Sequence, residues 1–219
     1  MKERGEGNAF SSFGTLVHSI LERYEKGELK LSDLADTFEN EFVESVPYKF
    51  PWNKYCNLRN KYYKQGLEFL KTFRGFDNYK ILGVEEKFES QIDDFVFTGI
   101  IDLIYEDDKG NLVVHDWKSK ADFKNNSEMH QYARQLYSYC IYVKEKFGRF
   151  PDICRFYMFR TQKPVDIKFS EEDFNNAIEW IQTTVKEIRN CWDFEPKQDD
   201  WFCNQLCNHR KTCEAKLEK

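Results

Sequence analysis

The sequence lacks the features that mark a membrane, secreted or repetitive protein. Its 219 residues contain no apolar run near the roughly 20 residues that a helix needs to cross a bilayer. The first residues, MKERGEGNAF, lack the apolar segment of a secretory signal. We see no internal repeat, low-complexity segment or long linker. We therefore expect one domain, spanning 1–219, in the cytoplasm and without a membrane partner.

The sequence also lacks an excess of positive charge. Lys and Arg number 33 against 38 Asp and Glu, so the formal net charge is −5. A protein that binds nucleic acid through its overall charge would be basic. The value does not exclude a nuclease, because a site that holds metal must itself be acidic. Any contact with DNA would have to come from a local basic stretch.

The cysteines fall into two groups. Their number is seven, which is odd, and without a secretory signal this argues against disulfides. Four are scattered and are typical of buried thiols: Cys56, Cys140, Cys154 and Cys191. The other three fall within eleven residues near the C-terminus: Cys203, Cys207 and Cys213.

Three stretches in the first third of the chain have helical character. Ser11 or Ser12 is predicted to cap the first helix, and Gly27 to end it. Ser32 is predicted to cap the second, and Gly75 to end the third. These predicted helices span 11–26, 31–45 and 53–75.

The pattern then changes to β-branched and aromatic residues with turn signals between them, which is typical of strands. A helix with a capping box of Ser170 and Asp173 is predicted near the end. The order predicts an α/β fold with a mixed central sheet flanked by helices. We expect a three-stranded antiparallel meander over 80–119, a helix at 127–147, strands at 152–160 and 164–169, a helix at 170–192, and an irregular tail. The parts are a helical region (about 1–78), a core that carries the sheet (about 79–192) and a cysteine-bearing tail (193–219).

Two acids occupy strand positions between apolar residues. Asp102 lies in TGIIDLIY and Asp116 in VVHDWK. Counting outward from the turn at 107–110 places them side by side in a hairpin. Two such carboxylates repel each other unless a cation lies between them, and a hard divalent ion with oxygen ligands is such a cation. Lys118 points to the same face as Asp116, and a simple salt bridge is the alternative interpretation of this pair.

Further motifs decide between these interpretations. Gly14 and His18 form G-x-x-x-H, and Gly99 and Asp102 form G-x-x-D. Asp116 and Lys118 form D-x-K, and Q-x-x-x-Y follows on the next predicted helix, at Gln135 and Tyr139. This ordered set resembles the RecB-like branch of the PD-(D/E)XK nuclease superfamily. That branch includes nuclease domains of bacterial recombination enzymes, phage exonucleases and CRISPR-adaptation nucleases.

The resemblance implies a restriction-endonuclease-like core and a role for each motif residue. His18, Asp102 and Asp116 would hold Mg²⁺ or Mn²⁺, together with the backbone carbonyl of Trp117. Lys118 would position or activate the attacking water. Residues for DNA contact would be Gln135 and Tyr139. Glu86, on the preceding strand, is a possible accessory residue.

The cysteine tail leaves three alternatives open. Cys203, Cys207 and Cys213 resemble the C-terminal part of a [4Fe–4S] site in this branch, but four thiolates are the usual requirement and no cysteine precedes His18. In the first alternative, a segment missing before this chain carries the fourth cysteine. In the second, His209 joins the three cysteines around Zn²⁺. In the third, the thiols are reduced and hold nothing.

The leading functional hypothesis is a metal-dependent DNA exonuclease in recombination, repair or phage DNA processing. A structure-selective or sequence-selective endonuclease of the same fold is the second. A catalytically inactive DNA-binding or recombination-partner module is the third. Besides DNA, we expect as partners either further subunits of a recombination or CRISPR-type complex, or copies of the same chain.

Overall fold

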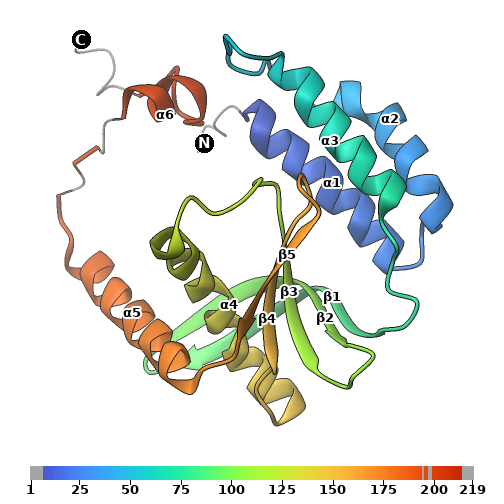
Figure 1. The fold of residues 1–219 in the computed structure, drawn as a ribbon. Helices are drawn as coiled ribbons and strands as arrows, with labels where there is room; N and C mark the ends of the chain where they lie inside the picture. Colours follow the sequence, from blue (N-terminus) through green and yellow to red (C-terminus); the bar gives the residue numbers. More distant parts are fainter. Residues whose placement is uncertain (1–6, 194, 197–198, 214–219) are drawn as a thin grey trace.

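A computed structural model describes residues 7–193, 195–196 and 199–213. Its centre is one five-stranded sheet with the strands in chain order, β1-β2-β3-β4-β5 (Figure 1). All neighbours pair antiparallel except β3 and β4, which are parallel. The predicted mixed sheet and antiparallel meander are therefore confirmed. The strands are β1 (Lys80–Ile92), β2 (Phe95–Glu106), β3 (Leu112–Lys118), β4 (Ile153–Met158) and β5 (Lys163–Lys168).

Helices cover both faces of this sheet. The three N-terminal helices pack on one another on one side, and α4 and α5 pack together on the other (Figure 1). Within the described residues no helix is both long and apolar enough to cross a membrane. The helices are α1 (Ala9–Glu25), α2 (Leu34–Ser45), α3 (Leu58–Thr72), α4 (Asn126–Phe147), α5 (Glu171–Asn190) and α6 (Asp200–Gln205), with a 3-10 turn, η1 (Leu31–Asp33), before α2.

The helix starts correct the predictions in the N-terminal part. The cap of α1 is Asn8, whose side chain accepts hydrogen bonds from two backbone N–H groups in the first turn, so neither Ser11 nor Ser12 is the N-cap. Ser32 does not cap α2, because it lies in a 3-10 turn and its hydroxyl donates to Asp33 instead.

Other helix ends were predicted only in part. Helix α3 starts at Leu58 and ends at Thr72, which is shorter than predicted at both ends. Ser170 does cap α5, but the Asp173 carboxylate accepts from Tyr137, and this replaces the reciprocal half of the predicted capping box. In the tail, predicted to be irregular, Asp199 caps the short helix α6.

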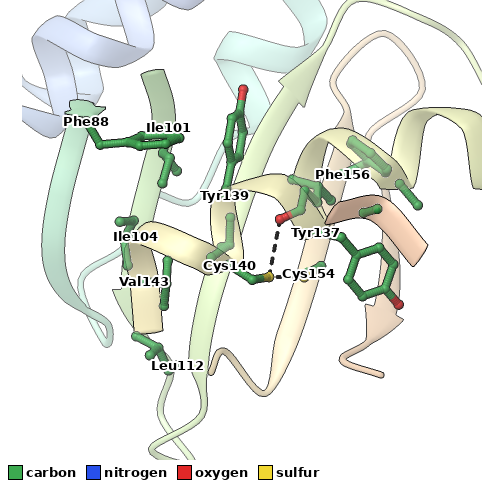
Figure 2. Packing of buried hydrophobic residues seen from close by; sticks show 14 of the residues in the cluster. Phe88, Ile101, Ile104, Leu112, Tyr137, Tyr139, Cys140, Val143, Cys154 and Phe156 are labelled. Atoms are coloured by element: carbon green, nitrogen blue, oxygen red, sulfur yellow. Dashed lines mark hydrogen bonds between the residues drawn. The ribbon is translucent and has the colours of Figure 1, made fainter. Parts of the chain in front are cut away.

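Two large apolar cores lie on the two faces of the sheet, in addition to a third, smaller cluster. One joins β1–β4 to α4 and contains Phe88, Val143 and Phe156 (Figure 2). It also holds Cys140 and Cys154, whose sulfur atoms lie 3.8 Å apart as free thiols, as predicted. The same prediction is wrong for the other two scattered cysteines, Cys56 and Cys191, because both are exposed. The other core joins the sheet to α1–α3 and is rich in aromatic rings. The functional residues lie between these two cores.

Candidate metal-dependent nuclease site

The hairpin of β2 and β3 brings two acids together. Leu103 pairs with His115, and continuing this register by one residue places Asp102 opposite Asp116, as the count from the turn predicted. The backbone N–H of Trp117 donates a 2.8 Å hydrogen bond to Oδ2 of Asp102. This bond fixes one carboxylate where the ladder between the two strands ends.

Lys118 lies on the same side of β3 as Asp116, as predicted. Its Nζ lies 2.6 Å from Oδ2 of Asp116 and 3.0 Å from Oε1 of Gln135, to which it donates. Gln135 in turn donates a 2.6 Å hydrogen bond to the hydroxyl of Tyr139. The salt bridge considered as the alternative is thus present, but it is part of a connected chain of contacts that runs from Asp116 through Lys118 and Gln135 to Tyr139. That chain holds the ammonium group beside the two acids.

A third element contributes an imidazole. Nδ1 of His18, on α1, lies 3.6 Å from Oδ2 of Asp102. One ligand atom each from His18, Asp102 and Glu85 lie within 4.8 Å of one another, a spacing that suits a single metal ion. Of the predicted metal ligands, His18 and Asp102 therefore meet directly. Asp116 lies beside this group, with Lys118 on its Oδ2.

Glu85 takes the place that was predicted for its neighbour. Glu86 accepts hydrogen bonds from Tyr142 and Lys146 of α4, so it faces away from the group of three. Glu85 is at a left-handed backbone position (φ 47°) between the pairs that place it opposite Asp102. A count outward from the β1–β2 turn would have found it, since the same rule aligned Asp102 with Asp116.

Burial and mutual repulsion shape the charges of the site. Burial raises the pKa of Asp102 to about 6, with the Glu85 charge adding to the effect and the Trp117 N–H opposing it. Burial also raises the pKa of Asp116 to about 6, although Lys118 works in the other direction. Burial also raises the pKa of Glu85. Burial lowers the pKa of His18, which leaves a neutral imidazole at neutral pH.

This arrangement fits a hard divalent ion. Carboxylate oxygens and a neutral imidazole are suitable donors for Mg²⁺ or Mn²⁺. Acids that are buried or partly buried side by side destabilise one another without a cation, and a metal ion removes that repulsion. In addition, Oδ2 of Asp116 is buried and, within the described part of the chain, accepts no well-directed hydrogen bond despite the nearby Lys118 ammonium.

Comparison with known proteins agrees with this chemistry. The family model described as PD-(D/E)XK nuclease superfamily matches residues 2–214. The chain belongs to the PD-(D/E)XK nuclease superfamily. Nucleases of this superfamily use divalent metal ions, and the restriction-endonuclease-like α/β fold agrees with the mixed five-stranded sheet found here.

Two further comparisons add no functional information. One similar solved structure, "Crystal structure of SSO0001", is 16% identical to this chain. The match covers 93% of this chain and 96% of that one, with a TM-score of 0.40. Among curated proteins, none matches the chain.

The glycines of the nuclease motifs allow close packing around the site. A Cβ at Gly14 would lie 3.3 Å from the hydroxyl of Ser119, so this glycine lets α1 approach the end of β3. A Cβ at Gly99 would lie 2.6 Å from the buried ring of Phe88 and 3.3 Å from Tyr139. Gly99 therefore leaves space for the tyrosine that holds Gln135.

We expect the Gly99→Ala variant to be destabilised by about 1–3 kcal/mol, the usual cost of overpacking a core. The Phe88 ring is 4% exposed and cannot swing into solvent. Urea unfolding measures the change. Thr98→Ala, at the exposed neighbouring position, is the control and should change stability by no more than about 0.5 kcal/mol. Equal stability of Gly99→Ala and the parental protein would show that the ring adapts freely.

The cysteine tail lies beside the start of α1 (Figure 1). Asn8 donates to the carbonyl of Leu206, and Arg210 donates to the carbonyl of Gly7. Among the residues that the structure describes, the tail thiols and His209 do not bring three ligand atoms within 4.8 Å of one another. An iron–sulfur cluster or Zn²⁺ at Cys203, Cys207 and Cys213 therefore stays a prediction.

Proposed function

We propose that this protein is a metal-dependent DNA nuclease, most simply an exonuclease of the RecB-like branch. The observation that carries the proposal is the convergence of His18, Asp102, Asp116 and Lys118 from three elements at one place. Membership of the nuclease superfamily supports the reaction class. The ordered motifs support the branch, and with it a role in recombination, repair or phage DNA processing.

Within this proposal, five residues would surround the metal ion. His18, Glu85 and Asp102 would hold Mg²⁺ or Mn²⁺, with Asp116 and the Trp117 carbonyl as further oxygen ligands. The metal ion supplies a Lewis acid for the phosphoryl oxygen of the scissile bond.

The contacts of Lys118 are consistent with either of two roles. Its ammonium, held by Gln135, orients the attacking water or offsets the negative charge that develops on the phosphate. Because Gln135 is exposed and Tyr139 is buried, Gln135 is the better placed of the two to reach the DNA backbone.

The function beyond hydrolysis is also part of this proposal. Further subunits of a recombination or CRISPR-type complex, or copies of this chain, would hold DNA that a single site binds weakly. A cluster or Zn²⁺ on the tail would brace the start of α1, where the tail already makes contact.

A cleavage assay with two DNA forms tests the proposal. With Mn²⁺ present, the parental protein should degrade end-labelled linear DNA and leave a covalently closed circle intact, because an exonuclease needs an end. Without divalent metal, both should survive. Cleavage of the circle would replace the exonuclease by an endonuclease. Absence of cleavage on single-stranded, duplex and circular DNA with either metal would identify an inactive binding module.

A further inference from the structure

Residues 45–67, here called the basic segment, concentrate positive charge in an acidic protein. They comprise the connection from α2 to α3 and more than half of α3. The segment contains no Asp or Glu, while the whole chain has a net charge of −5. Its five basic residues are Lys49, Lys54, Arg59, Lys61 and Lys64. This is the local basic stretch that contact with DNA requires in a chain of this charge.

The same segment exposes two large rings. Trp52 is 85% exposed and Tyr55 is 82% exposed. Nζ of Lys54 lies 4.8 Å from the centre of the Tyr55 ring. A groove of about 500 Å³ in the same segment is lined by Trp52 together with Lys49 and Asn57. Nothing in the described part of the chain covers either ring.

The rings stand on a fixed support. Phe10 of α1 packs edge-on against Phe50 and Tyr62, with ring centres 5.2 Å apart in each case. Arg59 donates a 2.9 Å hydrogen bond to the carbonyl of Val46, which ties the two ends of the connection together. The basic segment is therefore held against α1 by Phe50 and Tyr62. Trp52 and Tyr55 take no part in this packing and are exposed.

The basic segment is continuous with the candidate site. The guanidinium of Arg160 stacks 3.8 Å from the Tyr62 ring centre and donates to the carbonyl of Ser119, the residue after Lys118. Phe10, which contacts the segment, precedes His18 by eight residues, or about 12 Å along α1. At about 3.4 Å per nucleotide of a stacked strand, the axial distance from Phe10 to His18 corresponds to three or four nucleotides.

We propose that the basic segment binds single-stranded DNA next to the cleavage site, with bases stacked on Trp52 and Tyr55 and phosphates near Lys49 and Lys54. The inference deepens the proposed nuclease function and rests on it for the identity of the strand. Exposed aromatic rings beside lysines are the combination that binds single strands without sequence preference. Duplex DNA offers them only phosphates, because its bases are already stacked on one another.

A binding assay without cleavage tests this inference. The probe is a fluorescein-labelled 12-nucleotide thymidine strand, and its anisotropy is measured in EDTA. The double variant Trp52→Ala, Tyr55→Ala should bind it at least about tenfold more weakly, since stacking contributes about 1–3 kcal/mol per base. Trp52→Phe keeps a ring and should retain most of the affinity. Trp192→Ala removes a ring that is 92% exposed elsewhere and should bind like the parental protein.

Two further measurements complete the test: the salt dependence of binding in lysine variants, and the binding of a duplex probe by the ring variant. Lys49→Ala, Lys54→Ala should reduce the salt dependence of binding by about 1.4 in logarithmic slope, at about 0.7 per phosphate contact. Lys109→Ala, on the distant β2–β3 turn, should not change it. Unchanged binding by the ring variant, an equal loss in Trp192→Ala, or duplex binding that falls as much as single-strand binding would overturn the proposal. Binding through these rings by a protein that never cuts DNA would instead refute only the nuclease function.

Discussion

Lys118→Ala is expected to lower the rate of metal-dependent DNA cleavage by about 10³-fold, the upper end of the range for losing one charge-stabilising donor. Lys118 is the cation beside the two acids, 2.6 Å from Asp116 and anchored by Gln135. Without the Lys118 ammonium, the attacking water is no longer oriented and the negative charge on the phosphate is no longer offset. Single-turnover cleavage of end-labelled linear DNA with Mn²⁺ measures the loss, and Asp116→Ala should lose activity likewise.

The matched control is Lys120→Ala, two residues further along the chain. Lys120 pairs with Glu128 and lies over the ring of Tyr132, so its loss should change cleavage by no more than a fewfold. Circular dichroism should show that Lys118→Ala keeps the parental helix and strand content. Cleavage by folded Lys118→Ala at the parental rate would overturn the assignment of this site.

Divalent metal is expected to raise the melting temperature by about 5–10 °C at pH 7.5. An ion at 100 times its Kd adds about 2.7 kcal/mol of stability, and a chain of this size gains about 2–4 °C per kcal/mol. The physical source is relief of repulsion between Glu85, Asp102 and Asp116. Differential scanning fluorimetry with Mn²⁺ or Mg²⁺ measures the shift, and Ca²⁺ shows whether it needs a particular ion.

The shift should vanish as the pH falls below about 6. Burial raises the pKa of Asp102 and of Asp116 to about 6, so both carboxyls are protonated below that value and no longer bind metal. Because the folded state holds these protons more tightly than the unfolded state, the metal-free protein loses stability as the pH rises from about 4 to 6.

Asp102→Asn separates this effect from general charge screening. This variant removes a buried charge, so it should be more stable than the parental protein without metal at pH 7.5 and should show no shift with metal. Asp108→Asn, on the exposed turn, is the control and should keep the parental shift. A full metal shift in Asp102→Asn would place the ion elsewhere.

Strand pattern and register were the parts of this fold and site that the sequence could predict. The β-branched and aromatic residues of the predicted meander lie in β1 and β2, and the count from the turn between β2 and β3 aligned Asp102 with Asp116. These features depend on local geometry with a period of two. The prediction missed Glu85 because residues were counted outward from the β2–β3 turn only, and not from the β1–β2 turn.

Other features depend on contacts that no local pattern records. Three candidate cap residues lie within five positions at the start of α1, and Asn8 also bonds Leu206 of the distant tail. The anchoring of Lys118 by Gln135 joins β3 to α4. Arg160 links the end of β3 to α3 through Ser119 and Tyr62, and none of these residues belongs to a motif.

The parallel pairing of β3 with β4 bears on when the site forms during folding. The Asp102–Asp116 pair lies within a hairpin, which closes in microseconds. The Lys118–Gln135 bond needs α4, which is the crossover connection that the parallel pairing of β3 and β4 requires. The His18–Asp102 contact closes a loop that includes the whole segment between α1 and β2. Long closures are slow. A partly folded chain would therefore hold the acids without the imidazole and the anchored lysine, so the complete site forms only after α1 and α4 have docked on the sheet.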